Sequence, residues 1–200
     1  MATKQIKELF NGRYFEIPKY QRGYAWENKN VRELFDDIYE SLETDSNHYI
    51  GTIVLSEHLK ATDLYYVVDG QQRITTITMI INAIIQLLPK KDSEYYHRFY
   101  IEEVQHRLKM LGQDQRFFLS LLNRNEGEPE NKSQRFMKEA YEEICSTVSR
   151  EKDKLKLLKA IEKLEMMEFI EKSEGDAIRI FQTVNDRGKP LSNMEKAKSL

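Results

Sequence analysis

Cysteine is nearly absent from this 200-residue sequence, which contains only Cys145. A single cysteine excludes an internal disulfide, and a cysteine-based metal site would need ligands of other types. Cys145 lies in the segment AYEEICSTV, where a helical period places it among apolar residues. We therefore expect a buried structural thiol rather than a nucleophile. The four histidines lack the spacing of metal-ligating motifs such as HExxH.

Long apolar runs are also absent. The longest apolar stretch, residues 74–88, is interrupted by Thr, Asn and Gln and is too short to span a bilayer. The first thirty residues contain no apolar run flanked by basic residues, so we expect no signal peptide. These absences predict a soluble, cytoplasmic protein with no membrane partner.

Neither sign of charge dominates the sequence. The chain carries 31 Lys and Arg against 33 Asp and Glu, a formal net charge of −2. A domain that grips DNA over its whole surface is usually strongly basic, so a nucleic-acid contact would have to come from a local patch or from a further part of the protein. Hydrophobic residues, in contrast, make up 40% of the chain, which is enough for a core without disulfide or metal staples.

The apolar periodicity predicts an α+β fold. Helical spacing predicts helices over residues 3–10, 30–42, 75–88, 115–122, 133–148, 154–164 and 176–184. β-Branched and aromatic runs predict strands over residues 13–17, 49–56 and 64–68, and a further strand over residues 165–171. We expect a small α+β core over residues 1–90, followed by a mainly helical part over residues 91–200.

The strongest functional indication is the segment YYVVDGQQRITTITMI, in which a buried strand runs into Asp69 and Gly70 and then into an apolar helix. Backbone N–H groups at a helix start are unpaired, and the helix dipole favours an anion there. Gly70 permits a tight turn close to a ligand, and the guanidinium of Arg73 suits phosphate oxygens. Asp69 could hold a divalent cation, or orient a water molecule or Arg73. No GxxxxGK[ST] loop occurs in the chain, so this would not be a Walker site.

The same residues also have a purely structural interpretation. Asp69 can cap the following helix while Gln71, Gln72 and Arg73 stay solvated in its first turn, because acidic and polar residues are common there for stability alone. Local physics leaves both interpretations open.

A second polar segment, FEIPKYQRGYAWE, covers residues 15–27. Arg22 lies in it among three aromatic residues, an arrangement that can clamp a base by stacking and a phosphate by charge. In the alternative, the aromatic residues pack on the core and leave Arg22 exposed.

A third polar segment, FQTVNDRGKPLS, covers residues 181–192. Its Asn185-Asp186 pair and Gly188 predict a tight turn after a helix. Ser192 and Glu195 have the spacing of a capping box, and the closing residues SNMEKAKSL resemble the first turns of an amphipathic helix without a stop signal. We therefore expect the chain to stop inside a domain, with a following module absent.

These three polar segments, in this order, resemble the N-terminal domain of GmrSD-type modification-dependent restriction enzymes, a ParB/sulfiredoxin-like fold. The resemblance rests on IPKYQRGYAW (17–26), YIGTIVL (49–55), YVVDGQQRITT (66–76) and IFQTVNDRGKPLS (180–192), with a weaker match in RLKMLGQDQRFFLSLL (107–122). It covers nearly the whole chain. DGQQR with its flanking strand and Thr pair, and NDRG followed by LS, are its most specific motifs.

The resemblance implies a mixed-sheet core and a nucleotide site. The catalytic residues would be Asp69, Gln72 and Arg73, with Asp69 also holding the Mg²⁺ that accompanies a nucleoside triphosphate (NTP). The nucleotide and its phosphates would be bound by Gln21, Arg22, Gly70, Gln71, Arg73, Thr75, Thr76, Asn185 and Arg187. The preferred base, and the residue that activates water, are left open.

In this family, NTP hydrolysis is associated with restriction of phage DNA that carries modified bases or phosphorothioate backbones. An HNH-type nuclease domain usually follows, but no His-centred ββα-metal pattern occurs here, so we expect no nuclease activity from this chain alone. The resemblance thus predicts an NTP-hydrolysing module of an anti-phage restriction protein. Its partners would be NTP, modified DNA, a nuclease domain or subunit and, in a homo-oligomer, further copies of itself. The alternative is a non-hydrolysing sensor that grips a DNA phosphate or a nucleotide with the same loop.

Overall fold

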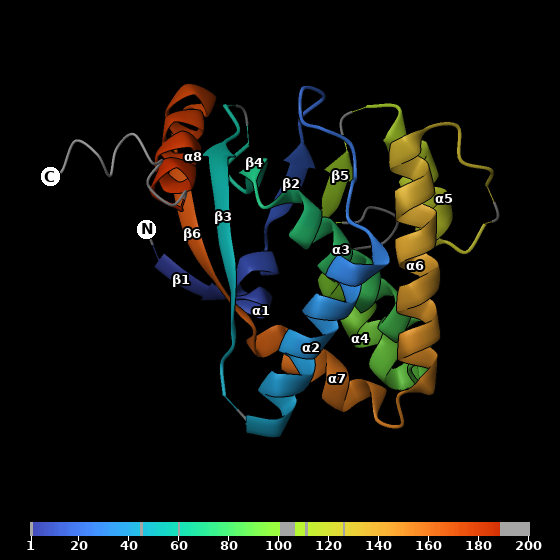
Figure 1. The fold of residues 1–200 in the computed structure, drawn as a ribbon. Coiled ribbons are helices and arrows are strands. Elements are labelled where there is room, and N and C mark those ends of the chain that lie inside the picture. Colours follow the sequence, from blue (N-terminus) through green and yellow to red (C-terminus); the bar gives the residue numbers. More distant parts are fainter. Residues whose placement is uncertain are drawn as a thin grey trace, which may run out of the picture.

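In the computed structural model, the chain forms a mixed sheet with helices on both faces (Figure 1). The structure describes residues 2–44, 46–59, 61–100, 107–110, 112–125 and 127–188, with only the backbone at 98 and 184–188. The strands are β1 (Ala2–Gln5), β2 (Tyr14–Ile17), β3 (Tyr49–Glu57), β4 (Leu64–Asp69), β5 (Leu108–Met110) and β6 (Glu165–Glu171). The helices are α1 (Ile6–Phe10), α2 (Asn28–Thr44), α3 (Gln71–Ile85), α4 (Lys90–Tyr100), α5 (Asp114–Leu122), α6 (Lys132–Arg150), α7 (Lys154–Lys163) and α8 (Glu174–Gly188). The predicted α+β class is confirmed, whereas the ParB/sulfiredoxin-like assignment stays a prediction.

Strand directions bring three loops to one edge of the sheet. The strand order is β1-β6-β3-β4-β2-β5, and β2 runs parallel to both of its neighbours, β4 and β5. Because the carboxyl ends of parallel strands meet at the same edge, the segments that follow Ile17, Asp69 and Met110 emerge beside one another. Open α/β sheets commonly bind ligands at such an edge.

The two central strands divide the core between the faces of the sheet. Ile53 and Val67 belong to the large apolar cluster formed with α1 to α7, whereas their neighbours Val54 and Val68 pack with Ala177 of α8. Successive residues of a strand face opposite sides, so this division follows from the pleat. Helix α8 therefore covers one face of β3, β4 and β6, with which it is in contact, and the other helices lie on the opposite face (Figure 1).

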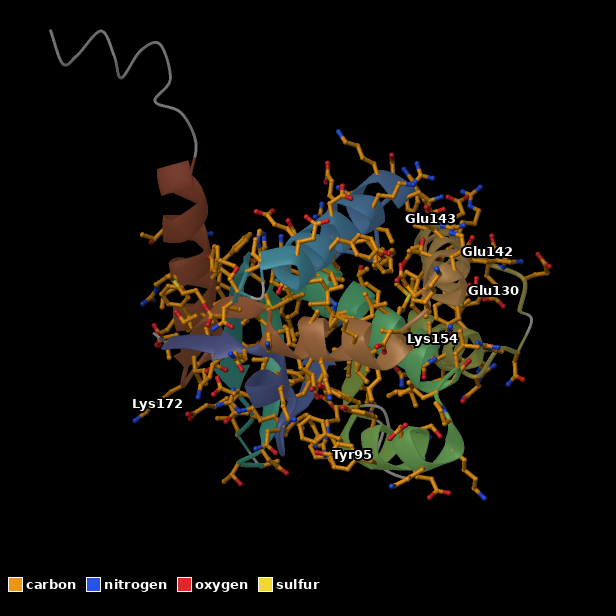
Figure 2. All side chains as sticks on the ribbon, turned by 90° about the horizontal axis from the view of Figure 1, so that it is seen from below. Tyr95, Glu130, Glu142, Glu143, Lys154 and Lys172 are labelled. Carbon is orange, nitrogen blue, oxygen red and sulfur yellow. The ribbon has the colours of Figure 1, made fainter. Side chains whose placement is uncertain are left out.

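The outer surface is charged where the helices face solvent. Figure 2 shows Glu142 and Glu143 of α6, together with Glu130, at one end of the molecule, and Lys172 at the opposite end. The inner side of α6 is apolar, with Met137 and Ile144 fully buried, as its helical spacing predicts. Among the described residues, no helix has the length and apolar character needed to cross a membrane.

Most predicted elements are confirmed, and β6 has the predicted bounds. Residues 3–10 are not one helix, however, because Ala2–Gln5 pair with β6 as an edge strand and only Ile6–Phe10 are helical. A pairing with a strand so distant in sequence leaves no trace in the local periodicity. Strand β5 and helix α4 were not predicted. Strands β5 and β6, which follow residue 90, join the same sheet as the first four strands. The predicted division of the chain at residue 90 stays a prediction.

The predicted turn at residues 185–188 is wrong. Helix α8 continues through Asn185, Asp186 and Arg187 to Gly188. Asn, Asp and Gly favour turns locally, but such preferences are weak and tertiary context overrides them. The predicted capping box of Ser192 and Glu195 lies outside the described residues.

Candidate functional site

The junction between β4 and α3 forms the centre of the site. Gly70 is the N-cap of α3 in a left-handed conformation, with φ +87°, and a Cβ added there would lie 2.9 Å from the carbonyl oxygen of Thr52. Helix α3 begins at Gln71, four residues earlier than predicted, so Arg73 does lie in its first turn. No side chain within the described part of the chain caps the helix. The structural interpretation, in which Asp69 caps α3, is therefore wrong.

The two glutamines of DGQQR are buried rather than solvated, each with 7% of its surface exposed. Gln72 accepts a hydrogen bond from the N–H of Ala25 at 2.8 Å and donates one to the carbonyl of Gly23 at 3.2 Å. Gln71 donates to the carbonyl of Arg22 at 3.2 Å. These amides thus hold the backbone of the loop after β2. A contact of either with phosphate or water stays a prediction.

Further hydrogen bonds hold the same loop from both sides. The Gln21 amide donates to the carbonyl of Val68 at 2.8 Å. The Tyr24 and Thr76 hydroxyls are 2.8 Å apart, and the N–H of Tyr24 donates to the Ser133 hydroxyl at 2.8 Å. Gln21 and Thr76, predicted to bind the nucleotide, are therefore part of the support that positions the loop.

Arg73 is half-buried, and none of its N–H groups donates a hydrogen bond to a described residue. Its guanidinium lies 5.7 Å from the ring centre of Trp26, and a Cβ on Gly51 would lie 2.6 Å from Nη1. Burial lowers the pKa of Arg73, whereas the charges of Asp37 and Asp69 raise it. No ion pair within the described part of the chain involves Arg73. Its donors are therefore available to an anion.

Asp69 lies close to this guanidinium at the carboxyl end of β4. Burial raises the pKa of the Asp69 carboxyl. A hydrogen bond from the Gly70 N–H and the positive charges of Arg73 and Arg22 oppose that shift. Arg22 itself is exposed on the loop above. The site thus combines one carboxylate, whose pKa burial raises, with two cations at different depths.

These groups surround a hollow of about 720 Å³ between α3, the loop after β2, and α8, which we call the α8 hollow. Its walls are formed by Tyr20, Gln21, Arg22, Trp26, Val68, Asp69, Gly70, Gln71, Gln72, Arg73, Ile178, Phe181 and Gln182. The volume lies within the usual range of ligand sites. Asp69 is the only carboxylate among these wall residues.

A second hollow, of about 530 Å³, lies on the other side of the loop, between the ends of β2 and β5 and the amino ends of α5 and α6. We call it the α5 hollow. Thr75 lines it, as do Asp114 and Lys132. The two hollows share four wall residues, which are Gln21, Arg22, Gln71 and Gln72.

Two predicted site residues, Asn185 and Arg187, are placed only by their backbone. Both belong to the last turn of α8, the helix whose Ile178 and Phe181 line the α8 hollow. Their side chains lie outside the described residues, so their predicted contact with phosphate stays a prediction.

Sequence reasoning placed Trp26 beside Arg22 rather than Arg73, and it did not assign Asp37 or Gly51 to the site, although all three surround Arg73. Of the two residues that were missed, only Gly51 carried a usable indication. A glycine inside a strand often marks a close approach by another group, and here φ of +119° accompanies the contact with the guanidinium. Asp37 comes from α2, and only the tertiary fold brings it near.

A metal held by the protein alone would need several ligands. Within the part of the chain that the structure describes, no three His, Cys, Asp or Glu side chains form a group that could hold a metal ion. The donor set does fit a magnesium–nucleotide complex, because Mg²⁺ in such sites takes one or two carboxylates together with substrate phosphates.

Comparison with known proteins identifies the family. No curated protein matches the chain. The family model for the GmrSD restriction endonuclease N-terminal domain matches residues 6–200, which is almost the entire sequence. The chain therefore belongs to the family of N-terminal domains of GmrSD restriction endonucleases.

Proposed function

We propose that this chain binds the phosphates of a nucleoside triphosphate in the α8 hollow and hydrolyses it, as a module of a restriction enzyme. One observation carries the proposal. Arg73 is half-buried at the start of α3, without an ion pair or hydrogen bond to any described residue. A cation partly withdrawn from water costs free energy unless an anion compensates it, and the charges of Asp37 and Asp69 offset the burial of Arg73 only in part. Phosphate, bound also by N–H groups of the α3 amino terminus, is such an anion.

The surrounding residues divide the work of binding. Arg73 donates to phosphate oxygens from the floor of the hollow, and Arg22 adds a second positive charge from the loop. Gln71 and Gln72 keep that loop seated on α3. Because the backbone of the loop is held before the ligand arrives, little backbone ordering is needed on binding.

Asp69 is the residue best placed to act on the reaction itself. It lies in the wall of the α8 hollow within the electrostatic range of Arg73. There it can orient the water whose oxygen attacks the terminal phosphorus while the bond to the leaving diphosphate breaks. Mg²⁺ bound with the nucleotide, held by Asp69, would neutralise charge on the phosphate oxygens.

Family membership supports a role in restriction. In that role, we propose that nucleotide turnover controls a nuclease domain or subunit that acts on modified DNA. A role in phage defence and a cytoplasmic location follow from the same proposal.

Calorimetric titration of ATP, GTP and CTP, each with Mg²⁺, tests the site. Arg73→Ala should weaken binding at least tenfold, because hydrogen bonds to a charged group are worth about 1.5–3 kcal/mol and 1.4 kcal/mol is a factor of ten. Arg150→Ala is the matched control, since Arg150 is exposed at the far end of α6. Phosphate release should fall in parallel in Arg73→Ala only.

Two outcomes would count against the proposal. Equal binding and hydrolysis by Arg73→Ala would remove Arg73 from the site. Tight DNA binding without nucleotide, lost on Arg73→Ala and weakened steeply by salt, would instead favour a sensor that uses the same guanidinium on a DNA phosphate.

A further inference from the structure

We propose that the α5 hollow receives the base of the bound nucleotide and selects guanine through Asp114. This inference rests on the proposed nucleotide site in the α8 hollow. The α5 hollow adjoins that site, because Gln21, Arg22 and Gln71 line both. Gln71 and Gln72 are buried against the loop, so a nucleotide whose phosphates lie against Arg73 would reach the α5 hollow by passing over the exposed Arg22. At about 530 Å³ the α5 hollow lies within the usual range of ligand sites.

Asp114, the one carboxylate among the wall residues of the α5 hollow, favours a ligand group that donates hydrogen bonds. Oδ1 of Asp114 accepts from the side-chain amides of Asn131 at 2.9 Å and Gln134 at 3.2 Å. Oδ2 accepts no hydrogen bond from the described residues and lies 3.5 Å from where a Cβ on Gly23 would be. The carboxylate is thus held by one oxygen while the other faces the loop that bounds the hollow.

Gln71 supplies an independent indication of a ligand at the shared wall. Its Oε1 is buried and has no hydrogen-bond partner among the described residues, while its Nε2 donates to the carbonyl of Arg22. An orphaned buried acceptor is costly and calls for a donor. A hydroxyl of the ribose, which lies between base and phosphates, is a donor of the required kind.

Guanine fits this set of groups better than the other bases. Its Watson–Crick edge presents two adjacent N–H donors, at N1 and at the N2 amino group, beside the O6 acceptor. Oδ2 of Asp114 can accept from both donors, and Lys19 or Lys132, which also line the hollow, can donate to O6. Adenine and cytosine would turn a ring-nitrogen lone pair toward the carboxylate. Uracil offers a single ring N–H between two carbonyls.

The first test uses the unaltered chain and calorimetry with Mg²⁺. GTP should bind about ten- to a hundredfold more tightly than ATP, since a good two-donor contact to a base discriminates by that factor. ITP lacks the N2 amino group and should bind about tenfold more weakly than GTP. Equal affinities for GTP, ITP and ATP, each still dependent on Arg73, would overturn the base assignment and leave the phosphate site intact.

The second test is Asp114→Asn. The amides of Asn131 and Gln134 should keep an oxygen in the Oδ1 position, so the new amide nitrogen replaces Oδ2 and becomes a donor. GTP affinity should fall about tenfold or more, whereas XTP, which carries a carbonyl at C2, should gain. Asp36→Asn, an exposed change on α2, is the control and should alter neither. Equal losses for GTP and XTP would mean that Asp114 only supports the fold, and would overturn the inference.

No binding of any nucleotide to the unaltered chain is a distinct result. It would remove the proposed phosphate site and the base assignment together. If binding is retained and still depends on Arg73, only the base assignment can have failed, and the phosphate site stands.

Discussion

Replacing Gly70 with alanine tests whether the close approach at the start of α3 builds the site. Gly70 combines a left-handed backbone with a Cβ position 2.9 Å from the Thr52 carbonyl oxygen and 3.3 Å from Ile53 Cα. A left-handed conformation costs an alanine about 1–2 kcal/mol. The Cβ would also press on the backbone of β3, which cannot rotate away as a side chain can. Overpacking of this kind costs about 1–3 kcal/mol more.

Gly12→Ala is a matched control for the backbone term. Gly12 also has a left-handed backbone, with φ +67°, but an added Cβ there meets no atom of the described residues within 4 Å. Gly12→Ala should therefore cost about 1–2 kcal/mol in the free energy of unfolding. Gly70→Ala should cost about 2–5 kcal/mol, the sum of the two contributions.

Urea unfolding followed by circular dichroism measures both variants. The difference between them isolates the contact with Thr52, since both alanines carry the same kind of backbone strain. Gly70→Ala should also weaken nucleotide binding, because relief of the overlap shifts the first turn of α3 and with it Arg73. If the two variants lose equal stability, or if Gly70→Ala binds nucleotide like the unaltered chain, the argument from close approach is refuted.

Two further changes follow from the geometry of the site. Asp69→Asn should stabilise the fold at pH 7 by less than about 1 kcal/mol, because burial raises the pKa of the Asp69 carboxyl in the folded state. The ionised carboxylate therefore destabilises the fold at neutral pH. This penalty diminishes as the pH falls through the folded-state pKa and vanishes below about pH 4. Melting temperatures of both proteins at pH 7 and pH 4 check this, and a less stable variant at pH 7 would contradict it. Gln72→Ala should cost about 1–3 kcal/mol, because it leaves the Ala25 N–H and the Gly23 carbonyl without their partner. Gln71→Ala should lower the free energy of unfolding by less, since it removes one hydrogen bond together with an orphaned oxygen. Urea unfolding of both variants measures the two losses, and a larger loss for Gln71→Ala would contradict the prediction.

Elements whose formation depends on neighbouring residues in the sequence could be predicted, and elements that depend on distant pairing could not. β6 was predicted with correct bounds because its short apolar run, flanked by Glu165 and Glu171, and the preceding helix end are local properties. The strand over residues 2–5 was missed because it exists only through pairing with β6. At residues 185–188, turn-forming composition was misleading, since α8 packs along three strands and continues to Gly188.

The candidate site shows the same limit. The DGQQR motif located Gly70 and Arg73 correctly at the start of a helix, because a strand, a glycine and an apolar helix follow one another in sequence. The motif did not reveal that Gln72 would use both ends of its amide on the loop after β2. Nor could it reveal Asp114, which a separate helix brings to the α5 hollow. Contacts between segments distant in sequence decide those roles.

The position of Trp26 makes the site optically visible. Trp26 is the only tryptophan in the chain, and its ring lies 5.7 Å from the guanidinium carbon of Arg73. Intrinsic emission excited in the tryptophan band therefore originates at the wall of the α8 hollow and nowhere else in the protein. A ligand that draws Arg73 toward itself, or a loop that leaves α3, would change the wavelength or quenching of that emission. Stopped-flow fluorescence can thus follow loop and ligand in real time, without a label.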